Sequence, residues 1–290
     1  MEWKWAIKAV VWAVKLARRL RAQRLLARLR DRAVFGVLHP LHLDVLHAMR
    51  GLAVHMMAWG EYDEAGELAS RICTGCRKVM GTLLELKPNE LHCCLKVMAP
   101  RGDASDPDRV ATWMRSEPYD DRPIEIGNAN AHLVGTNTVW CALFGRSDGI
   151  TNWRPFTCFA CNDLAERVDL FKCDRETWAR YYRSTLVFPL RYISANSGMA
   201  YENIGFLAFD SPRVGAFAGL PDIFEYRDRL TEYQDLLENS SVFHLGAILA
   251  DTLSALLRRC YQDRLLHQNM EVHHAGAEDQ RDAAVDSDHP

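Results

Sequence analysis

The sequence lacks the long uncharged segment that a membrane-spanning helix requires. Its longest stretch without Asp, Glu, Lys or Arg is Ile126–Gly145, which contains three Asn, one His and two Thr. A spanning helix needs about 20 mostly apolar residues, so we expect none here. Near the start of the chain, Lys4, Lys8 and Lys15 interrupt any apolar run. This argues against a secretory leader and predicts a cytoplasmic protein.

Common nucleotide-binding and hydrolase fingerprints are also missing. The chain contains no P-loop, no G-x-G-x-x-G, no H-E-x-x-H and no G-x-S-x-G. No pattern therefore points to a phosphate-binding loop, a zinc protease or a nucleophile elbow. With 290 residues, 48% of them hydrophobic, the chain is nevertheless long enough to bury a substantial core.

Positive charge is concentrated at the start of the chain. Residues 1–32 carry ten Lys and Arg against Glu2 and Asp31, a net charge of +8, whereas the whole chain has a net charge of −3. The segment 2–32 has no Gly or Pro, which predicts one long helix. We expect residues 1–38 to form a basic amphipathic arm that contacts a protein partner, a second copy of itself or an anionic membrane surface. Nucleic acid is disfavoured as a partner.

After His39-Pro40, helical and strand-like segments follow in a mixed order. The polar, acidic residues 269–290 are expected to be a disordered tail. The order predicts an α+β domain over residues 41–268, with a central antiparallel sheet and helices along one side of it. The expected helices are 41–86 with a turn near 60–63, 130–145 capped by Asn130, and 226–268 broken near 239–241; the expected strands are 91–99, 109–115, 154–160, 184–193 and 203–210.

Residues 181–212 carry the most specific pattern in the chain. Two strand-like runs, YRSTLVFPL and IGFLAFDS, flank a gap rich in Ser, Asn and Gly and precede a long helix. This arrangement resembles the C-terminal half of a GAF domain, and the similarity extends more weakly over about residues 45–266. The matching positions are Ser184, Pro189, Leu190, Ile204, Gly205, Leu207, Asp210 and Ser211. The resemblance implies a GAF/PAS-like fold with a ligand pocket between the sheet and the segment 130–165.

The same resemblance selects candidate ligand-binding residues. Asn137 and Thr138 could hydrogen-bond a small ligand and Trp140 could stack on it, or Trp140 could belong to the core and the polar pair to a turn. Arg183 could pair with a phosphate or carboxylate, or form a surface ion pair. Asp163 is interpreted chiefly as a helix cap. The full set of candidates is Asn137, Thr138, Trp140, Asp163, Tyr182, Arg183 and Ser184.

The resemblance implies a non-catalytic sensor that binds an unknown small molecule and relays binding through the N-terminal helix. Bacterial stress or defence signalling is the setting expected of such a sensor. The cyclic-nucleotide constellation and the bilin attachment site found in some GAF domains are absent, so neither ligand nor cofactor is specified. A ligand-free adaptor with the same fold is an alternative.

Nine cysteines leave two chemical alternatives open, although we expect reduced thiols. The Cys173-Asp174 pair upstream of Ser184-Thr-Leu-Val-Phe-Pro resembles free methionine-R-sulfoxide reductases. This implies Cys173 as nucleophile and Cys161, or Cys141, as resolving thiol, although that family's Trp-x-Gly-Phe-Tyr stretch is missing. Two C-x-x-C motifs could instead supply four zinc ligands. These ligands would be Cys73, Cys76, Cys158 and Cys161.

Overall fold

The computed structural model describes residues 62–98, 108–117, 132–173, 178–193, 201–255 and 257. The predicted basic arm at 1–38, the first part of the helical segment 41–86 and the acidic tail at 269–290 lie outside these residues. Both boundaries predicted for the domain, 41 and 268, lie outside them as well.

One six-stranded sheet organises the described residues, in the order β3-β2-β1-β6-β5-β4. Every neighbouring pair of strands is antiparallel, so the predicted α+β class with an antiparallel sheet is confirmed. The strands are β1 (His92–Met98), β2 (Arg109–Arg115), β3 (His132–Leu133), β4 (Phe159–Cys161), β5 (Ser184–Ile193) and β6 (Tyr201–Ser211). The helical elements are α2 (Tyr62–Leu84), η2 (Val134–Thr136), α3 (Thr138–Phe144), η3 (Leu164–Arg167), α4 (Trp178–Tyr181), η4 (Ile223–Glu225), α5 (Leu230–Glu238) and helical residues 241–255.

The β5–β6 hairpin is the longest pairing in the sheet. Its register runs from Ser184 opposite Ser211 to Ile193 opposite Tyr201, with an irregularity after Leu190. The prediction that residues 184–193 and 203–210 form neighbouring antiparallel strands is therefore confirmed. Gly205 lies where β6 approaches β1 so closely that an added Cβ would stand 2.1 Å from the backbone oxygen of Lys96. Only glycine fits such an approach without displacing backbone.

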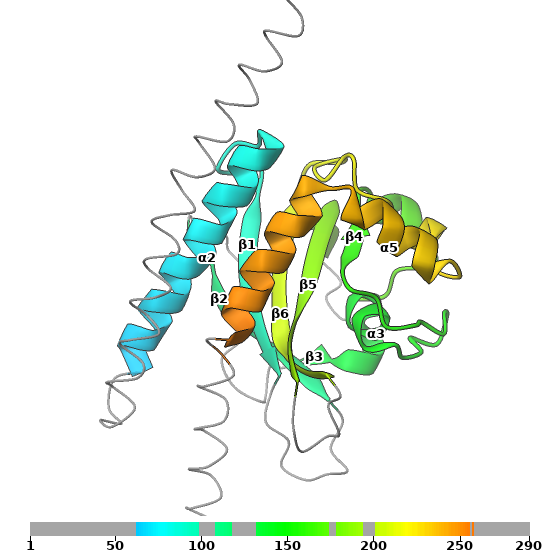
Figure 1. Ribbon diagram of the computed structural model, residues 1–290, viewed down its shortest axis with the longest axis horizontal. Helices are drawn as coiled ribbons and strands as arrows, with labels where there is room; N and C mark the ends of the chain where they lie inside the picture. The colour runs from blue at the N-terminus through cyan, green and yellow to red at the C-terminus, as the bar shows by residue number, and fades with distance from the viewer. Residues whose placement is uncertain are drawn as a thin grey trace, which may run out of the picture.

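Two long helices cover one face of the sheet, as Figure 1 shows for α2 and the orange helix at residues 241–255. Phe188 of β5 packs on Phe243 of that helix, with ring centroids 6.0 Å apart. An added Cβ on Gly246 would lie 2.2 Å from two ring carbons of Phe188. The helix can therefore approach the sheet this closely because residue 246 has no side chain.

The opposite face of the sheet is covered by α3 and the loops around it (Figure 1), so the prediction of helices along one side of the sheet is wrong. The predicted helix at 130–145 is wrong in its start: residues 132–133 form β3, and α3 begins at Thr138. Its N-cap is Asn137, whose side chain accepts a hydrogen bond from the Val139 amide, rather than the predicted Asn130. The helix ends at Gly145, which adopts the left-handed conformation with φ 68°, as glycine commonly does at helix ends.

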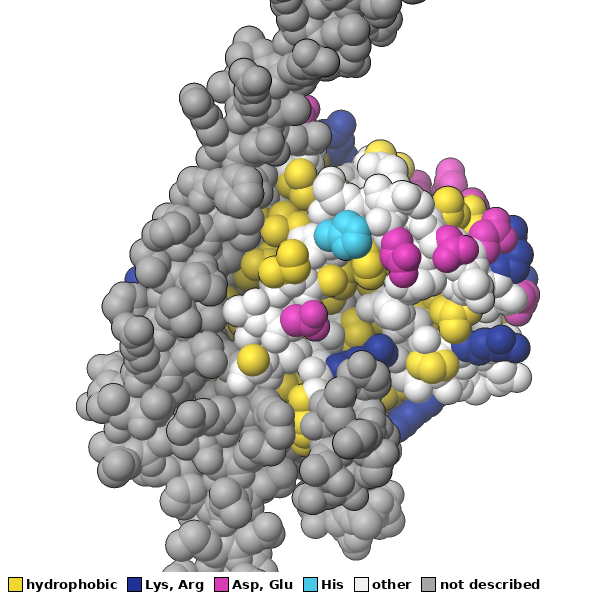
Figure 2. All heavy atoms as spheres, in the orientation of Figure 1, with side chains coloured by type: hydrophobic (Ala, Val, Ile, Leu, Met, Phe, Trp, Pro, Cys, Tyr) yellow, Lys and Arg dark blue, Asp and Glu magenta, His cyan; other side chains and the backbone are white. Residues whose placement is uncertain are grey.

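Two further boundaries differ from the sequence prediction. The strand predicted at 154–160 is a strand only at Phe159–Cys161; Pro155, which has no N–H to donate, precedes it. The last helical region begins later than residue 226, and its predicted break near Asn239 is confirmed, since α5 ends at Glu238 and a new helix starts at residue 241. In α5, Tyr233 and Leu237 are buried. Acidic side chains gather over this helix in Figure 2, where α5 exposes Glu232, Asp235 and Glu238.

Candidate functional site

A small cavity lies between α3 and the face of the sheet that α3 covers. Its volume is about 60 Å³. Five strands, the start of α3 and two flanking loops contribute its lining, which is rich in polar and charged side chains. The lining residues are Lys96, Arg115, His132, Asn137, Val139, Trp140, Phe171, Cys173, Tyr182, Thr185, Val187, Ala208 and Asp210.

Trp140 forms the aromatic wall of this cavity. Its ring lies on Phe206 of β6, with centroids 4.6 Å apart and planes inclined by 32°. The ammonium group of Lys96 stands 5.5 Å from the Trp140 ring centroid, within the range of a cation–π interaction. Trp140 is therefore a core residue, which was one of its two sequence interpretations, and it also lines the cavity.

Asn137 and Tyr182 contact the half-buried thiol of Cys173 from two sides. The Asn137 Nδ2 lies 3.6 Å from Cys173 Sγ, and the Tyr182 hydroxyl lies 3.5 Å from the same sulfur. The Oδ1 of Asn137 already accepts the Val139 amide as the helix cap. This leaves the amide NH₂ as the part of Asn137 that is not used in capping.

Two buried N–H groups of the cavity residues have no hydrogen-bond partner within the described part of the chain. They are Nε of Arg115 and Nε1 of Trp140, on side chains that are only 4% and 5% exposed. Buried donors are almost always paired, and an unpaired one costs about 1–3 kcal/mol. Other polar groups of the lining are paired: Lys96 Nζ donates to Thr112 Oγ1 at 2.8 Å, and Thr185 Oγ1 donates to Asp210 Oδ1 at 2.7 Å.

Thr138, by contrast, holds α3 in place and does not line the cavity. Its hydroxyl donates to Asp148 Oδ2 at 2.8 Å and accepts from the Lys172 amide at 2.8 Å. Asp148 also accepts hydrogen bonds from the indole of Trp153 and from two backbone amides. Burial opposes ionisation of Asp148, but these hydrogen bonds outweigh it and lower its pKa. The ionised carboxylate thus anchors the first turn of α3.

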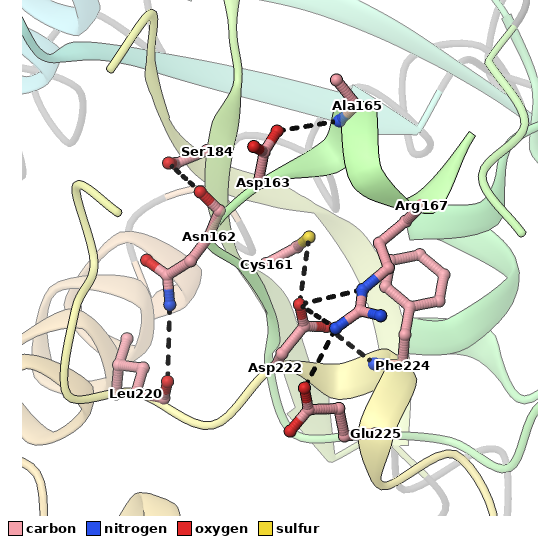
Figure 3. Close-up of polar contacts among 10 residues, drawn as sticks. All are labelled: Cys161, Asn162, Asp163, Ala165, Arg167, Ser184, Leu220, Asp222, Phe224 and Glu225. Carbon is pink, nitrogen blue, oxygen red and sulfur yellow. Dashed lines mark hydrogen bonds and ion pairs between the residues drawn. The ribbon is translucent and has the colours of Figure 1, made fainter. Parts of the chain in front are cut away.

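Three further candidates lie at the ends of β4 and β5, outside the cavity lining. Asp163 caps η3 by accepting from the Ala165 amide, which confirms its interpretation as a cap. Arg183 donates to both carboxylate oxygens of Asp163, at 2.9 and 3.0 Å, so it forms the ion pair that was the alternative to ligand binding. The Ser184 hydroxyl donates to the carbonyl oxygen of Asn162 at 2.7 Å, as Figure 3 shows.

Cys161 faces the half-buried carboxylate of Asp222. Its thiol donates to Asp222 Oδ2 at 3.6 Å, and the same oxygen accepts from Arg167 (Figure 3). Burial, followed by the charge of Asp222, raises the pKa of Cys161 well above its usual range. Burial also raises the pKa of Cys141 to about 11. Both thiols proposed to resolve a Cys173 intermediate are therefore held protonated at neutral pH.

The two C-x-x-C motifs do not come together as a metal site. Across the described residues, no three His, Cys, Asp or Glu side chains are placed to share a metal ion. Cys73 and Cys76 face Cys93 of β1 in the core, where burial and these two thiols raise the pKa of Cys93. Burial raises the pKa of Cys158 to about 12. The eight cysteines in the described residues are free thiols, and only Cys173 among them is not fully buried.

The cavity therefore includes three of the seven predicted ligand-binding residues: Asn137, Trp140 and Tyr182. Sequence reasoning missed its cationic side chains, Lys96 and Arg115. Arg115 ends β2 as Arg109 begins it, so no local signal distinguishes it. Lys96 carried a signal, because it is a charged residue inside the short, otherwise largely apolar strand β1. Such a residue is costly to bury unless its charge has a use.

The chain matches no protein-family model and no curated protein sequence. In the described residues, no helix has the length and apolarity needed to cross a bilayer.

Proposed function

We propose that this protein is a non-catalytic, GAF-like sensor that binds a small molecule in the cavity between α3 and the sheet. One observation carries the proposal: Asn137, Trp140 and Tyr182, selected from sequence as ligand contacts, line the same cavity. Small-molecule sites are usually concave and combine aromatic walls with convergent polar groups, and both kinds of side chain line this cavity.

The size of the cavity limits the ligand. A volume of about 60 Å³ holds roughly four water molecules, or a ligand of four or five non-hydrogen atoms. Drug-sized ligands occupy pockets of about 300–1,000 Å³. A nucleotide would thus extend well beyond this volume, whereas a compact metabolite would not.

The proposed output is the segment at residues 1–38, for which the sequence predicts a helix and which precedes α2 in the chain. Ligand binding can influence this arm only if the ligand has unequal affinity for two arrangements of it. The arm would then dimerise, dock a protein partner or contact a membrane surface. Comparing the oligomeric mass and the binding to anionic vesicles of the full chain and of a variant lacking residues 1–32 distinguishes these outputs.

Cys173 keeps the thiol redox enzyme as a second candidate, because it lines the cavity and is not fully buried. A catalytic thiolate would react with iodoacetamide faster than the same cysteine in the unfolded chain. A thiol that only contacts ligand would react more slowly than in the unfolded chain, because it is half-buried and hydrogen-bonded. The protonated state of Cys161 and Cys141 favours the sensor.

A thermal-shift screen tests the sensor proposal and separates it from a ligand-free adaptor. A ligand at a hundred times its Kd adds about 2.7 kcal/mol to the free energy of unfolding, which corresponds to a Tm increase of roughly 5–10 °C for a chain of this size. Ala208→Val adds two carbons to the cavity wall and should abolish the shift.

Ala111→Val is the matched control. It makes the same change in the same sheet. Thr112 pairs with Lys96, whose side chain is on the cavity side. Successive residues of a strand point to opposite faces, so Ala111 faces away from the cavity. Ala111→Val should keep the ligand-induced shift. Equal shifts in both variants would refute binding in this cavity.

A further inference from the structure

We propose that the cavity captures a compact aldehyde that carries a second oxygen, a 2-oxoaldehyde, as a reversible adduct of the Cys173 thiol. This inference rests on the proposed function and names the class of its ligand. It depends on the surroundings of Cys173, on the unpaired guanidinium of Arg115 and on the size of the cavity.

Cys173 is the accessible thiol of the described residues. Seven of the eight cysteines there are buried, whereas Cys173 is half-buried and lines the cavity. A cysteine sulfur is a strong nucleophile toward carbonyl carbon, provided that the carbonyl can reach it. Within the described part of the chain, Cys173 is therefore the thiol that a small carbonyl compound can meet.

An amide donor stands beside that sulfur with its orientation fixed. The Oδ1 of Asn137 accepts the Val139 amide at 3.0 Å, so the amide group cannot turn over without giving up the helix cap. Its Nδ2 lies 3.6 Å from Cys173 Sγ, and the Tyr182 hydroxyl lies 3.5 Å from the same sulfur. In an adduct, one carbon atom separates the former carbonyl oxygen from the sulfur, so a donor beside the sulfur also reaches that oxygen. Donors placed where this oxygen gains charge stabilise the addition.

Arg115 favours a ligand with a second oxygen. Its side chain is 4% exposed and lines the cavity, and within the described residues its guanidinium has no hydrogen bond or ion pair. The Nε is enclosed by protein, so contact with a ligand falls to the two terminal nitrogens. These groups donate and cannot accept, and burying them without an acceptor is costly. The second oxygen of a 2-oxoaldehyde supplies such an acceptor.

Addition of the thiol to such an aldehyde needs no further reagent. The sulfur forms a bond to the aldehyde carbon, the carbon–oxygen double bond becomes a single bond, and the thiol proton moves to the oxygen. The product is a hemithioacetal; nothing is oxidised or reduced, and the reverse reaction releases the aldehyde unchanged. The cavity volume of about 60 Å³ accommodates roughly four or five non-hydrogen atoms, so glyoxal and methylglyoxal fit and sugars do not.

The experiment measures protection of Cys173 from iodoacetamide in the full-length protein, with peptide mass spectrometry to follow Cys173 separately from the other cysteines. Methylglyoxal is the probe, and at a hundred times its Kd it should slow alkylation about 100-fold. Dilution should restore the rate, which separates the adduct from permanent modification of arginine. Hydroxyacetone, which has the same non-hydrogen atoms but an alcohol in place of the aldehyde, is the matched control and should not protect. N-acetylcysteine is the reference thiol, and half-protection of Cys173 should need about 10-fold less methylglyoxal.

Variants assign the effect to the cavity. Asn137→Asp keeps an oxygen that caps α3 and removes the donor beside the sulfur, so it should weaken protection about 10-fold. Arg115→Met removes the unpaired guanidinium and should weaken protection by a similar factor. Arg183→Met removes an arginine outside the cavity and should leave protection unchanged. Each variant is compared with its own alkylation rate without aldehyde, which separates a loss of binding from a change in folding.

The outcomes separate the two proposals. Equal protection by hydroxyacetone and methylglyoxal overturns covalent capture and leaves the sensor proposal standing, because both compounds then bind without a bond to sulfur. Protection no stronger than that of N-acetylcysteine, or equal in wild type, Asn137→Asp and Arg115→Met, also overturns it, because the cavity then adds nothing to the reaction of a free thiol. If methylglyoxal gives no protection but another small compound raises Tm, the aldehyde assignment fails alone. If no compound protects Cys173 or raises Tm, the sensor proposal itself fails.

Discussion

The contact between Gly246 and Phe188 offers a quantitative test of how the helix at residues 241–255 packs on the sheet. An alanine Cβ at position 246 would lie 2.2 Å from both Cε2 and Cζ of Phe188. Phe188 is 2% exposed and packs on Phe243, so its ring has little room to yield. Gly246→Ala therefore forces either the ring or the helix to shift.

Two opposing effects set the size of the change. Replacing glycine by alanine inside a helix gains about 1 kcal/mol. Overpacking a well-packed core costs about 1–3 kcal/mol. The free energy of unfolding of Gly246→Ala should therefore fall by up to about 2 kcal/mol. In a Phe188→Leu background the ring is gone, and the same substitution should be neutral or stabilising by about 1 kcal/mol.

Chemical denaturation of the four proteins of this double-mutant cycle measures the coupling, which should be about 1–3 kcal/mol. Gly81→Ala is the matched control, since Gly81 is also helical and an added Cβ would meet nothing closer than 3.7 Å. It should stabilise the protein by up to about 1 kcal/mol. Additivity of Gly246→Ala and Phe188→Leu to within about 0.5 kcal/mol would refute this packing.

Three further substitutions test the site and its supports. Asp148→Asn should lower the free energy of unfolding by about 1–3 kcal/mol at pH 7. Because hydrogen bonds hold the pKa of Asp148 below its ordinary value in the folded protein, the wild-type advantage should disappear as pH falls through that lowered pKa. Urea titrations at several pH values measure this. Gly205→Ala places a Cβ 2.1 Å from the Lys96 carbonyl oxygen and should cost about 1–3 kcal/mol or more by the same assay; a neutral result would contradict the close approach of β6 and β1. Arg183→Ala breaks the partly exposed pair with Asp163 and should cost under about 1 kcal/mol, with ligand-induced thermal shifts unchanged; loss of those shifts would make Arg183 part of the site.

Most strands were predictable because their signals are local. The runs at 184–193 and 203–210 are rich in residues that favour strands, and the polar gap between them favours a reversal of the chain. The strand at 109–115 was located for the same reason. These strand signals depend only on neighbouring residues in the sequence, so they can be recognised without knowledge of the fold.

The start of α3 was not predictable in the same way. Asn130 and Asn137 are equally good caps from sequence. In the structure, Asn137 is the cap, and the next residue, Thr138, hydrogen-bonds to Asp148 and to the Lys172 amide. These partners lie 10 and 34 residues away in the sequence. Long-range contacts of this kind cannot be seen in a local pattern.

The sequence by itself determined the class of fold, the hairpin and three of the residues that line the cavity. Only the tertiary structure decided that Lys96 and Arg115 join them and that Arg183 does not. The physical reason is register: antiparallel pairing of β2, β1, β6 and β5 brings side chains from distant segments to one face of the sheet. A carboxylate close in space, which the sequence pattern does not reveal, pairs Arg183 with Asp163 outside the cavity.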